Sequence, residues 1–356
     1  MELVLDYTAI KMRFDLLLSK RSLTVSETET VMDSLLTHSD SHQIAAFLAV
    51  LKNRGETVEE IIGMKNALLK RSIPVVLPYP VIDIVGTGGD LANMVNISTG
   101  SSFLAAACGI PVAKHGNRSV SSRSGSADVL EAMGVNIEIA PDKVAECLEH
   151  ANITFMFAPY YNSSLKLLRA ARNGLKFPTV INLMGPLLNP SKAAYSLIGV
   201  ASLDALELIS QVVMGDKSKK RTLVFHGCGL DELTPLGPIV AYEVFDGKRI
   251  RHDLDPQALG FAPCSLKDLQ GGDATENAGL LLDVFAGKQN AVADSLIFNA
   301  GAALWIFGIS STLKEGIAKA RGVHREGLAM QTLIKLQQFS PLKYPLNGLP
   351  ASTEHK

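Results

Sequence analysis

The chain has 356 residues, of which 47% are apolar and 19% are charged. This length and composition are those of a globular protein with one large or two moderate domains, and they exclude an intrinsically disordered chain. The formal net charge of -1 provides no overall field that would attract nucleic acid or an anionic membrane.

Neither a secretory leader nor a membrane-spanning helix is expected. The N-terminus shows no basic flank followed by an apolar stretch, and no window of about 18 residues is free of charge and apolar throughout. The 4 cysteines form no CxxC pair and no metal-ligand spacing, so we expect reduced thiols. These features predict a cytoplasmic protein without a membrane partner.

Residues 1–75 are predicted to form helices only. Apolar residues recur there at helical spacing, and no strand-like alternation interrupts them. Ser26 with Glu29, and Thr57 with Glu60, fit the capping box that begins a helix. A helical segment of this kind usually packs on the body that follows it or forms an interface, and we favour an interface between subunits.

From residue 76 onward, apolar runs of strand length alternate with helical patterns, which is typical of parallel βαβ construction. The expected strands are 81–85, 112–113, 135–139, 153–158, 196–201 and 222–226. A hairpin is expected over 239–251, with Asp246-Gly247 at its turn. Helices are expected to dominate between residues 273 and 339.

Residues 165–190 interrupt this alternation with two helix-like pieces whose ends are rich in Pro and Gly. We expect this insertion to join the N-terminal helices, with its ends acting as hinges. The predicted fold class is therefore α/β, with a small N-terminal helical domain and a larger α/β domain whose central, mainly parallel sheet is flanked by helices. The predicted boundaries are 1–75 with 165–190 for the helical domain, 76–164 with 191–345 for the α/β domain, and 346–356 for a tail.

Glycines, hydroxyls and charges follow the first two predicted strands. Gly86-Thr87-Gly88-Gly89-Asp90 ends the first strand, Asn96-Ile97-Ser98-Thr99 opens the next helix, and Lys114-His115-Gly116-Asn117-Arg118 ends the second strand. The glycine loop matches neither the GxGxxG fingerprint nor a P-loop. Because strand C-termini and helix N-termini converge in open α/β folds, these segments indicate a site for an anion such as phosphate. A tight turn and plain helix caps are the alternative structural readings.

Cations and carboxylates extend this predicted site. Lys114 and Arg118, with the serines that follow them, supply both charge and directional donors for a diphosphate. Asp231 and Glu232 follow another strand end and suit Mg²⁺, which bridges few carboxylates to phosphate oxygens. An acid pair at a helix N-terminus is the alternative reading. No proton-transfer role is assigned to His115.

Six motifs, in order and in spacing, carry a resemblance to a known family: GTGGD, NIST, KHGNRxVSS, GSADVLEAMG, NLMGPLLNP and GLDE. From about Gln43 to about Leu336 the chain resembles the anthranilate phosphoribosyltransferases of tryptophan biosynthesis. The resemblance implies a nucleoside-phosphorylase-type architecture and a homodimer formed through the helical domain. It also implies Mg²⁺-dependent transfer of phosphoribose from 5-phosphoribosyl 1-diphosphate (PRPP) to anthranilate, which gives N-(5-phosphoribosyl)anthranilate and diphosphate.

The same resemblance implies roles for individual residues. It implies that PRPP contacts Gly86, Gly89, Asp90, Asn96, Ser98, Thr99, Lys114, Asn117, Arg118, Ser119, Ser121, Ser122 and Ser126. It implies that Mg²⁺ is held by Ser98, Asp231 and Glu232, and that the acceptor lies near His115, Asn117, Asn162 and Arg172. Lys114, Asn117 and Arg118 are the residues expected at the reacting centre.

Three departures from the usual family pattern leave alternatives open. Asn162-Ser163 stands in place of His-Pro, Pro178 in place of Arg, and Met94 in place of a hydroxyl residue of the glycine loop. A related phosphoribosyltransferase with another aromatic acceptor is one alternative. A pyrimidine nucleoside phosphorylase is a second, and it would leave the acid pair without a metal. A non-catalytic nucleic-acid-binding relative is a third, and it predicts a basic face.

Overall fold

The structure is a computed structural model that describes residues 20–38, 41–89, 92–119 and 123–342, together with Asp15 and Leu18. The predicted tail and three of the predicted site residues, Asp90, Ser121 and Ser122, lie outside the described residues. Among the described residues, no helix is long and apolar enough to cross a membrane.

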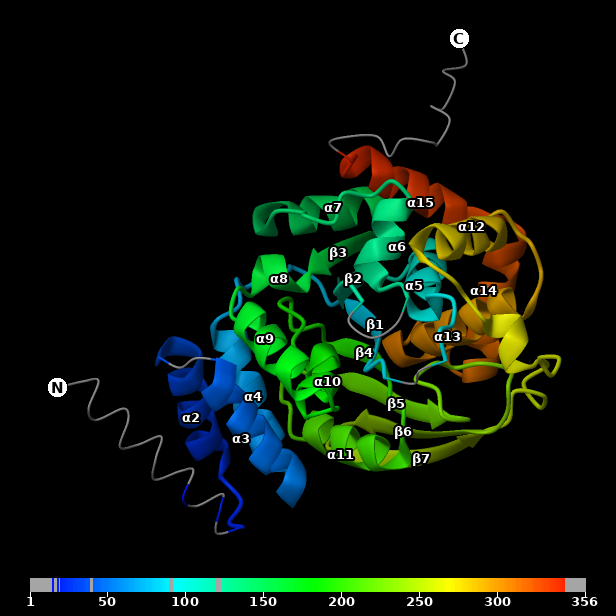
Figure 1. Cartoon of the computed structure of the whole chain (residues 1–356). Coiled ribbons are helices and arrows are strands. Elements are labelled where there is room, and N and C mark those ends of the chain that lie inside the picture. Colours follow the sequence, from blue (N-terminus) through cyan, green and yellow to red (C-terminus); the bar gives the residue numbers. More distant parts are fainter. Residues whose placement is uncertain are drawn as a thin grey trace.

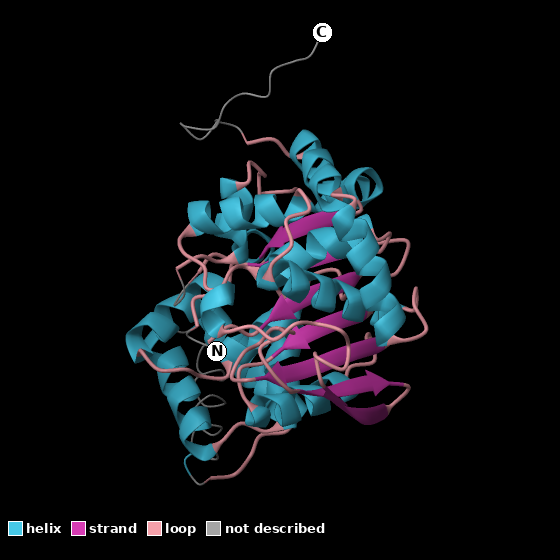
Figure 2. Ribbon diagram, turned by 90° about the vertical axis from the view of Figure 1, so that its right-hand side faces the viewer, coloured by secondary structure: helices cyan, strands magenta, loops and turns pink. Residues whose placement is uncertain are grey.

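A seven-stranded sheet forms the centre of the molecule, with strand order β3-β2-β1-β4-β5-β6-β7 (Figure 2). The strands are β1 (Ile82–Gly86), β2 (Val112–Gly116), β3 (Ile153–Phe157), β4 (Tyr195–Gly199), β5 (Arg221–Gly227), β6 (Ile239–Phe245) and β7 (Lys248–Leu254). The first five are mutually parallel, and β6 and β7 add an antiparallel edge. The predicted α/β class with a mainly parallel sheet is confirmed.

Most predicted strands coincide with observed ones, but the one predicted at 135–139 is wrong. Its side chains alternate between buried and less buried positions, as the sequence suggested. No neighbouring strand is available to it, however, and its backbone makes only an isolated bridge from Val135 to Pro341. The predicted hairpin is confirmed, and Asp246 and Gly247 both adopt the positive φ that a tight two-residue turn requires.

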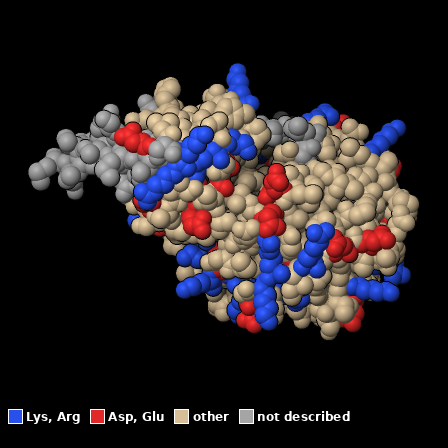
Figure 3. Space-filling view, turned by 90° about the horizontal axis from the view of Figure 1, so that it is seen from below, with Lys and Arg blue, Asp and Glu red and all other residues tan. Residues whose placement is uncertain are grey.

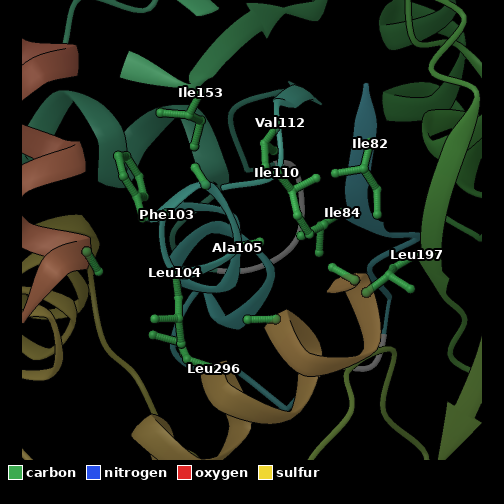
Figure 4. Packing of buried hydrophobic residues seen from close by; sticks show 14 of the residues in the cluster. Ile82, Ile84, Phe103, Leu104, Ala105, Ile110, Val112, Ile153, Leu197 and Leu296 are labelled. Atoms are coloured by element: carbon green, nitrogen blue, oxygen red, sulfur yellow. The ribbon is translucent and has the colours of Figure 1, made fainter. Parts of the chain in front are cut away.

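Both faces of the sheet are buried over β1 to β5, where alternate strand residues point to opposite sides. Ile82 and Ile84 of β1 belong to one apolar cluster, which helices α5 and α13 cover, while Ile198 of β4 belongs to a second cluster that includes α11. Figure 4 shows Ile82, Ile84 and Leu197 directed toward α5 and Leu296 of α13. The helices of the α/β part are α5 (Ile97–Ala107), α6 (Ser126–Ala132), α7 (Val144–Ala151), α8 (Ala158–Tyr161), α11 (Leu203–Met214), α12 (Ala274–Phe285), α13 (Ala291–Phe307), α14 (Leu313–Arg325) and α15 (Leu328–Phe339).

The N-terminal helices α2 (Val25–His38), α3 (Ser41–Arg54) and α4 (Val58–Lys70) gather at one side of the molecule, beside α9 (Leu165–Leu175) (Figure 1). Side chains of α3, α4, α9 and α10 (Ile181–Met184) share one buried apolar cluster. The predicted insertion therefore packs against the N-terminal helices, and the predicted domain boundaries stay a prediction.

Only one of the two predicted capping boxes occurs as expected. Thr57 and Glu60 form a complete capping box at the start of α4. At the start of α2 the reciprocal bonds join Thr24 and Glu27 instead of Ser26 and Glu29, so this prediction was wrong by two residues. Both pairs have the Thr/Ser-x-x-Glu spacing, so the spacing alone does not show which pair begins α2.

The chain reverses its direction across the sheet between β1 and β4. After β1 it adds β2 and β3 on one side, then crosses back to place β4 against the other edge of β1. Ligands bind outside the carboxyl ends of the strands at such a reversal, because the loops there diverge and leave a crevice. Gly86 and Gly199, the last residues of these two strands, lie side by side at this point.

Candidate active site

A cavity of about 560 Å³ opens at the carboxyl ends of β1 and β2. The glycine loop after β1, the first turn of α5, the end of β2, helix α9 and the loop after β5 line it. The predicted site residues that line it are Gly86, Gly89, Asn96, Ser98, Thr99, Lys114, His115, Asn117, Arg118, Ser119, Ser126, Arg172, Asp231 and Glu232. Segments far apart in the sequence therefore meet in one cavity, as expected.

The acid pair is held against the glycine loop and α5 by backbone hydrogen bonds. The N–H of Gly88 donates to Oδ2 of Asp231 at 2.7 Å, and the N–H of Ser98 donates to Oε1 of Glu232 at 2.9 Å. Both acids are largely buried, with exposures of 7% and 8%. The two carboxylates therefore lie in the loop after β5 and face the glycine loop after β1 and the first turn of α5.

Two glycines make the close approach of Asp231 possible. A Cβ atom on Gly86 would lie 2.1 Å from Oδ2 of Asp231, and one on Gly199 would lie 1.7 Å from its backbone oxygen. Any larger residue at either strand end would displace the loop that carries the acid pair. The need for glycine here comes from this packing and not from backbone conformation, since neither residue has a positive φ.

Lys114 places a buried ammonium beside the acid pair. Its Nζ donates to the carbonyl oxygen of Ile84 at 2.5 Å and to Oγ of Ser98 at 3.4 Å. Burial lowers the pKa of Lys114, and the nearby carboxylates of Asp83, Glu232 and Asp231 oppose this shift. The ammonium thus lies near both the acid pair and the first turn of α5.

Two side chains at the start of α5 differ in their hydrogen bonds. The Oγ1 of Thr99 is buried and has no hydrogen-bond partner in the described part of the chain, so it can serve a ligand. Asn96, in contrast, is held firmly: its Nδ2 donates to the carbonyl oxygen of Ser124, and its Oδ1 accepts from Nδ2 of Asn277.

Asn277 and Asn189 are supporting residues that the sequence did not identify. Asn277 positions Asn96 from helix α12, 181 residues away in sequence. Asn189 donates from Nδ2 both to Oδ2 of the buried Asp83 and to the carbonyl oxygen of Ala113, which ties β1 to β2 below the cavity. Asn189 lies in the NLMGPLLNP motif that carries the family resemblance, but no local pattern reveals partners so distant in sequence.

His115 is buried under the cavity at the end of β2. The backbone N–H of His115 donates to Oδ1 of Asp83 at 3.3 Å. Burial is the main cause that lowers the pKa of its ring, against the opposing influence of Asp83. Burial therefore favours the neutral imidazole in the folded protein.

Arg118 lies at the rim, and its guanidinium is engaged with acids of α6. It contacts Glu131 through both terminal nitrogens and Asp128 at 3.2 Å. Asp128 also accepts from the N–H groups of Ser119 and Gly125, so it closes the loop around this arginine. The guanidinium would have to exchange these partners in order to reach a diphosphate.

The predicted acceptor residues are only partly brought together. Arg172 of α9 is half-buried in the cavity wall, whereas Asn162 does not line the cavity. The Asn162 amide donates to the carbonyl oxygen of Leu68 and to Oγ of Ser72, and its oxygen accepts from Ser164. Its hydrogen-bonding groups are thus used to join α4 to the segment before α9. The structure corrects the expectation that Asn162 faces the acceptor.

Comparison with known proteins decides the family. A family model for the α/β domain of a glycosyl transferase family matches residues 78–330, and the model of its helical bundle domain matches residues 15–72. The chain is 56% identical, over 91% of its length and 94% of the relative's, to an anthranilate phosphoribosyltransferase of Chlamydia caviae. The chain belongs to the anthranilate phosphoribosyltransferase family. A relative with the same name from a Methylobacterium species is 43% identical over 90% of this chain.

Solved structures of anthranilate phosphoribosyltransferases have the same fold. The enzyme of Thermus thermophilus superposes with a TM-score of 0.86 at 36% identity, covering 93% of this chain and 98% of that one. The Saccharomyces cerevisiae enzyme, solved in complex with PRPP and Mg, superposes with a TM-score of 0.85 at 26% identity over the same shares. As a member of this family, the chain is a glycosyltransferase.

The acid pair fits the magnesium chemistry of the anthranilate phosphoribosyltransferases. The described residues contain no group of three or more His, Cys, Asp or Glu side chains that could hold a metal alone. Mg²⁺ does not need such a group, because it is bound by one or two carboxylates while substrate phosphates and water complete its shell. Asp231 and Glu232, which face the glycine loop and the first turn of α5, would supply these two carboxylates.

Proposed function

We propose that this chain catalyses the Mg²⁺-dependent transfer of phosphoribose from PRPP to anthranilate, giving N-(5-phosphoribosyl)anthranilate and diphosphate. The observation that carries the proposal is that two walls, built from different elements, line one cavity. One wall joins the glycine loop, Lys114 and the acid pair, and the other presents Arg172 from helix α9. A polyphosphate and an aromatic carboxylate therefore each have a suitable side of the same cavity.

On the first wall, the main chain and Thr99 would bind PRPP. Gly86 and Gly89 permit close backbone approach, Thr99 offers a buried hydroxyl without a partner, and Asn96 is already fixed in position. Asp231 and Glu232, with Ser98, would hold Mg²⁺, which when bound neutralises charge on the diphosphate. We propose that PRPP also contacts Asn117, Ser119 and Ser126 at the end of β2, with Asp90, Ser121 and Ser122 as expected from the sequence.

Lys114 would stabilise the departing diphosphate. Its buried ammonium lies near the acid pair and the first turn of α5, where negative charge would grow as the C1–oxygen bond of the ribose breaks. A preorganised cation in a site with little water is worth more there than in bulk solvent. Arg118 would add a second cation once it leaves Glu131 and Asp128.

On the second wall, Arg172 would orient the acceptor through its carboxylate. A guanidinium suits this task because its planar fork matches a carboxylate with two hydrogen bonds. The arylamine nitrogen is unprotonated near neutral pH and attacks C1 directly, so the site requires no strong base. The gain in rate would come from holding both substrates in line.

The competing functions lack comparable support. Asn162 was one reason to consider another aromatic acceptor. Its amide, however, donates a hydrogen bond to Leu68 of α4, and the residue does not line the cavity. A nucleic-acid-binding relative would need a continuous basic face, and on the face in Figure 3 the acidic and basic side chains are interspersed. A nucleoside phosphorylase would leave the buried acid pair without a metal to bind.

Three further expectations stay proposals. We propose a homodimer formed through the helices α2 to α4, a cytoplasmic location, and a helical domain of residues 1–75 and 165–190 hinged to the α/β domain. The shared apolar cluster of α3, α4 and α9 supports the last of these. Sedimentation analysis tests the dimer: a single monomer-sized species at micromolar concentration would contradict it.

The proposed reaction is tested by following the loss of anthranilate fluorescence with PRPP and Mg²⁺, together with diphosphate release. We expect turnover that stops when a chelator removes Mg²⁺ and returns when Mg²⁺ is restored. Absence of turnover under saturating PRPP and Mg²⁺ would reject anthranilate as the acceptor. Diphosphate release with a different aromatic amine would then point to the related phosphoribosyltransferase.

A further inference from the structure

Helix α9 carries two more cations into the cavity besides Arg172. Lys166, Arg169 and Arg172 all line the cavity and follow one another at three-residue spacing along the helix. Residues three apart are neighbours on a helix surface, so Arg169 lies next to Arg172. Leu168 and Ala171 on the same helix are buried in the apolar cluster shared with α3 and α4, which fixes the helix orientation.

The two arginines have no counter-charge within the described protein. None of the ion pairs among the described residues involves Arg169 or Arg172, although most other arginines there are paired. Arg172 instead has its pKa lowered, first by burial and then by the positive charge of Arg169. Like charges at this spacing destabilise a helix, so the arrangement is unfavourable until an anion arrives.

The phosphate-binding wall does not supply that anion. The carboxylates of Asp231 and Glu232 are hydrogen-bonded to the glycine loop and α5. The acids of α6 are engaged by Arg118 and by backbone N–H groups. The missing negative charge on the α9 wall is therefore expected from a ligand, and the acceptor is the substrate proposed for this wall.

We propose that Arg169 is a specificity-determining residue that binds the acceptor carboxylate together with Arg172. This inference rests on the proposed function and deepens it, since it concerns the acceptor side of the same cavity. Half-buried Arg172 would fix the carboxylate, while the more exposed Arg169 contacts its outer oxygen and adds positive potential at the entrance. The acceptor class that follows is aromatic amines with an ionised carboxylate next to the amine, in preference to neutral analogues.

The test compares the parent enzyme with Arg169→Gln, using anthranilate and its neutral carboxamide, 2-aminobenzamide, as acceptors. Loss of one charged hydrogen-bonding partner at a partly exposed site should raise the anthranilate KM roughly five- to thirtyfold. The carboxamide KM and the PRPP KM should change less than twofold, as a rough limit. Arg169→Lys should fall between parent and Arg169→Gln, because it keeps the charge and loses the planar fork.

A matched control is Lys176→Asn, which removes a positive charge from the end of the same helix. Lys176 is exposed, does not line the cavity, and has a left-handed backbone conformation that asparagine tolerates. This variant should behave like the parent with both acceptors. Thermal melting should show no loss of stability for Arg169→Gln, because the substitution relieves repulsion in the free enzyme.

The outcomes separate this inference from the proposed function. An unchanged ratio of anthranilate to carboxamide KM values in Arg169→Gln would overturn it, and so would an effect on the PRPP KM alone, which would assign Arg169 to the phosphates. No turnover by the parent would reject the reaction instead. In that case calorimetric titration of anthranilate into PRPP-loaded parent and Arg169→Gln still measures the carboxylate contact, and equal affinities would overturn it.

Discussion

The carboxylate of Asp231 accepts a hydrogen bond of 2.7 Å from the backbone N–H of Gly88, 143 residues away in sequence. This contact joins the loop after β5 to the loop after β1, and it brings the proposed magnesium ligands to the proposed phosphate loop. It exists only because Gly86 and Gly199 leave room for the aspartate between the ends of β1 and β4. The geometry of the proposed site thus depends on two residues that carry no side chain.

Gly86→Ala should impair catalysis much more than stability. The new Cβ would meet Oδ2 of Asp231 at 2.1 Å, so that side chain must move out of its place beside Gly88. A displacement of about 1 Å among reacting groups can reduce the rate about 100-fold, and we expect a loss of this size in kcat/KM for PRPP. Steady-state kinetics and a thermal melt would measure the two effects.

Gly279→Ala provides the control for this substitution. Gly279 lies within α12, and nothing stands within 4 Å of the Cβ it would gain. The change should leave activity intact and raise stability by about 0.5–1 kcal/mol, the usual gain for alanine over glycine in a helix. Equal activity of both alanine variants would show that Asp231 is not confined as described.

The double substitution Asp231→Asn, Glu232→Gln should weaken magnesium use. Both replacements keep an oxygen that can accept from Gly88 and Ser98, so the loops should stay in place while the negative charge is lost. We expect the half-saturating Mg²⁺ concentration to rise at least about tenfold, the smaller end of what altered metal environments cause. Magnesium titrations of initial rate measure this, and superimposable titration curves for variant and parent would remove the acid pair from the metal site.

Arg172→Lys should affect the acceptor selectively. Lysine keeps the charge but cannot form the paired hydrogen bonds of a guanidinium with a carboxylate. Because a hydrogen bond to a charged group is worth about 1.5–3 kcal/mol, we expect the anthranilate KM to rise roughly ten- to a hundredfold. The PRPP KM serves as the internal control, and an equal rise in both constants would indicate a general distortion of the cavity.

Asn162→Ala should lower stability without changing PRPP use. The alanine removes the donors to Leu68 and Ser72 and the acceptor for Ser164, all at a buried position. Leaving such groups unsatisfied costs about 1–3 kcal/mol each, part of which water recovers. Urea denaturation would measure the free energy of unfolding. Unchanged stability with a raised anthranilate KM would instead return Asn162 to the acceptor site, as the sequence had suggested.

Acidification should destabilise the free enzyme through His115. Burial lowers the pKa of this ring in the folded state, while in the unfolded chain it stays near the ordinary value of 6.5. The unfolded state therefore binds the proton first, and stability that is present above about pH 6.5 is lost as pH falls toward the folded pKa. His115→Gln should flatten this dependence in thermal melts between pH 5 and 7.5, although His324, whose pKa burial also lowers, should retain part of it. Identical slopes for variant and parent would assign the loss to other groups.

The sequence by itself determined the class of fold and most of the chemistry. Parallel strands were predicted because apolar runs that end in glycines alternate with helical patterns. Lys114, Asp231 and Glu232 were identified because they follow the ends of predicted strands. These features are local, since the period of burial and the conformations open to glycine are written in neighbouring residues.

Tertiary structure decided what depends on partners distant in the chain. Residues 135–139 alternate like a strand, yet no neighbouring strand reaches them. Asn162 reads as an acceptor residue, yet Leu68 of α4 takes its amide. Asn277 reads as one polar residue of a helix, yet it holds Asn96 in the cavity. Hydrogen bonds act over a few ångströms of space, so only the packing could show which of these groups meet, and that Arg169 and Arg172 form no ion pair among the described residues.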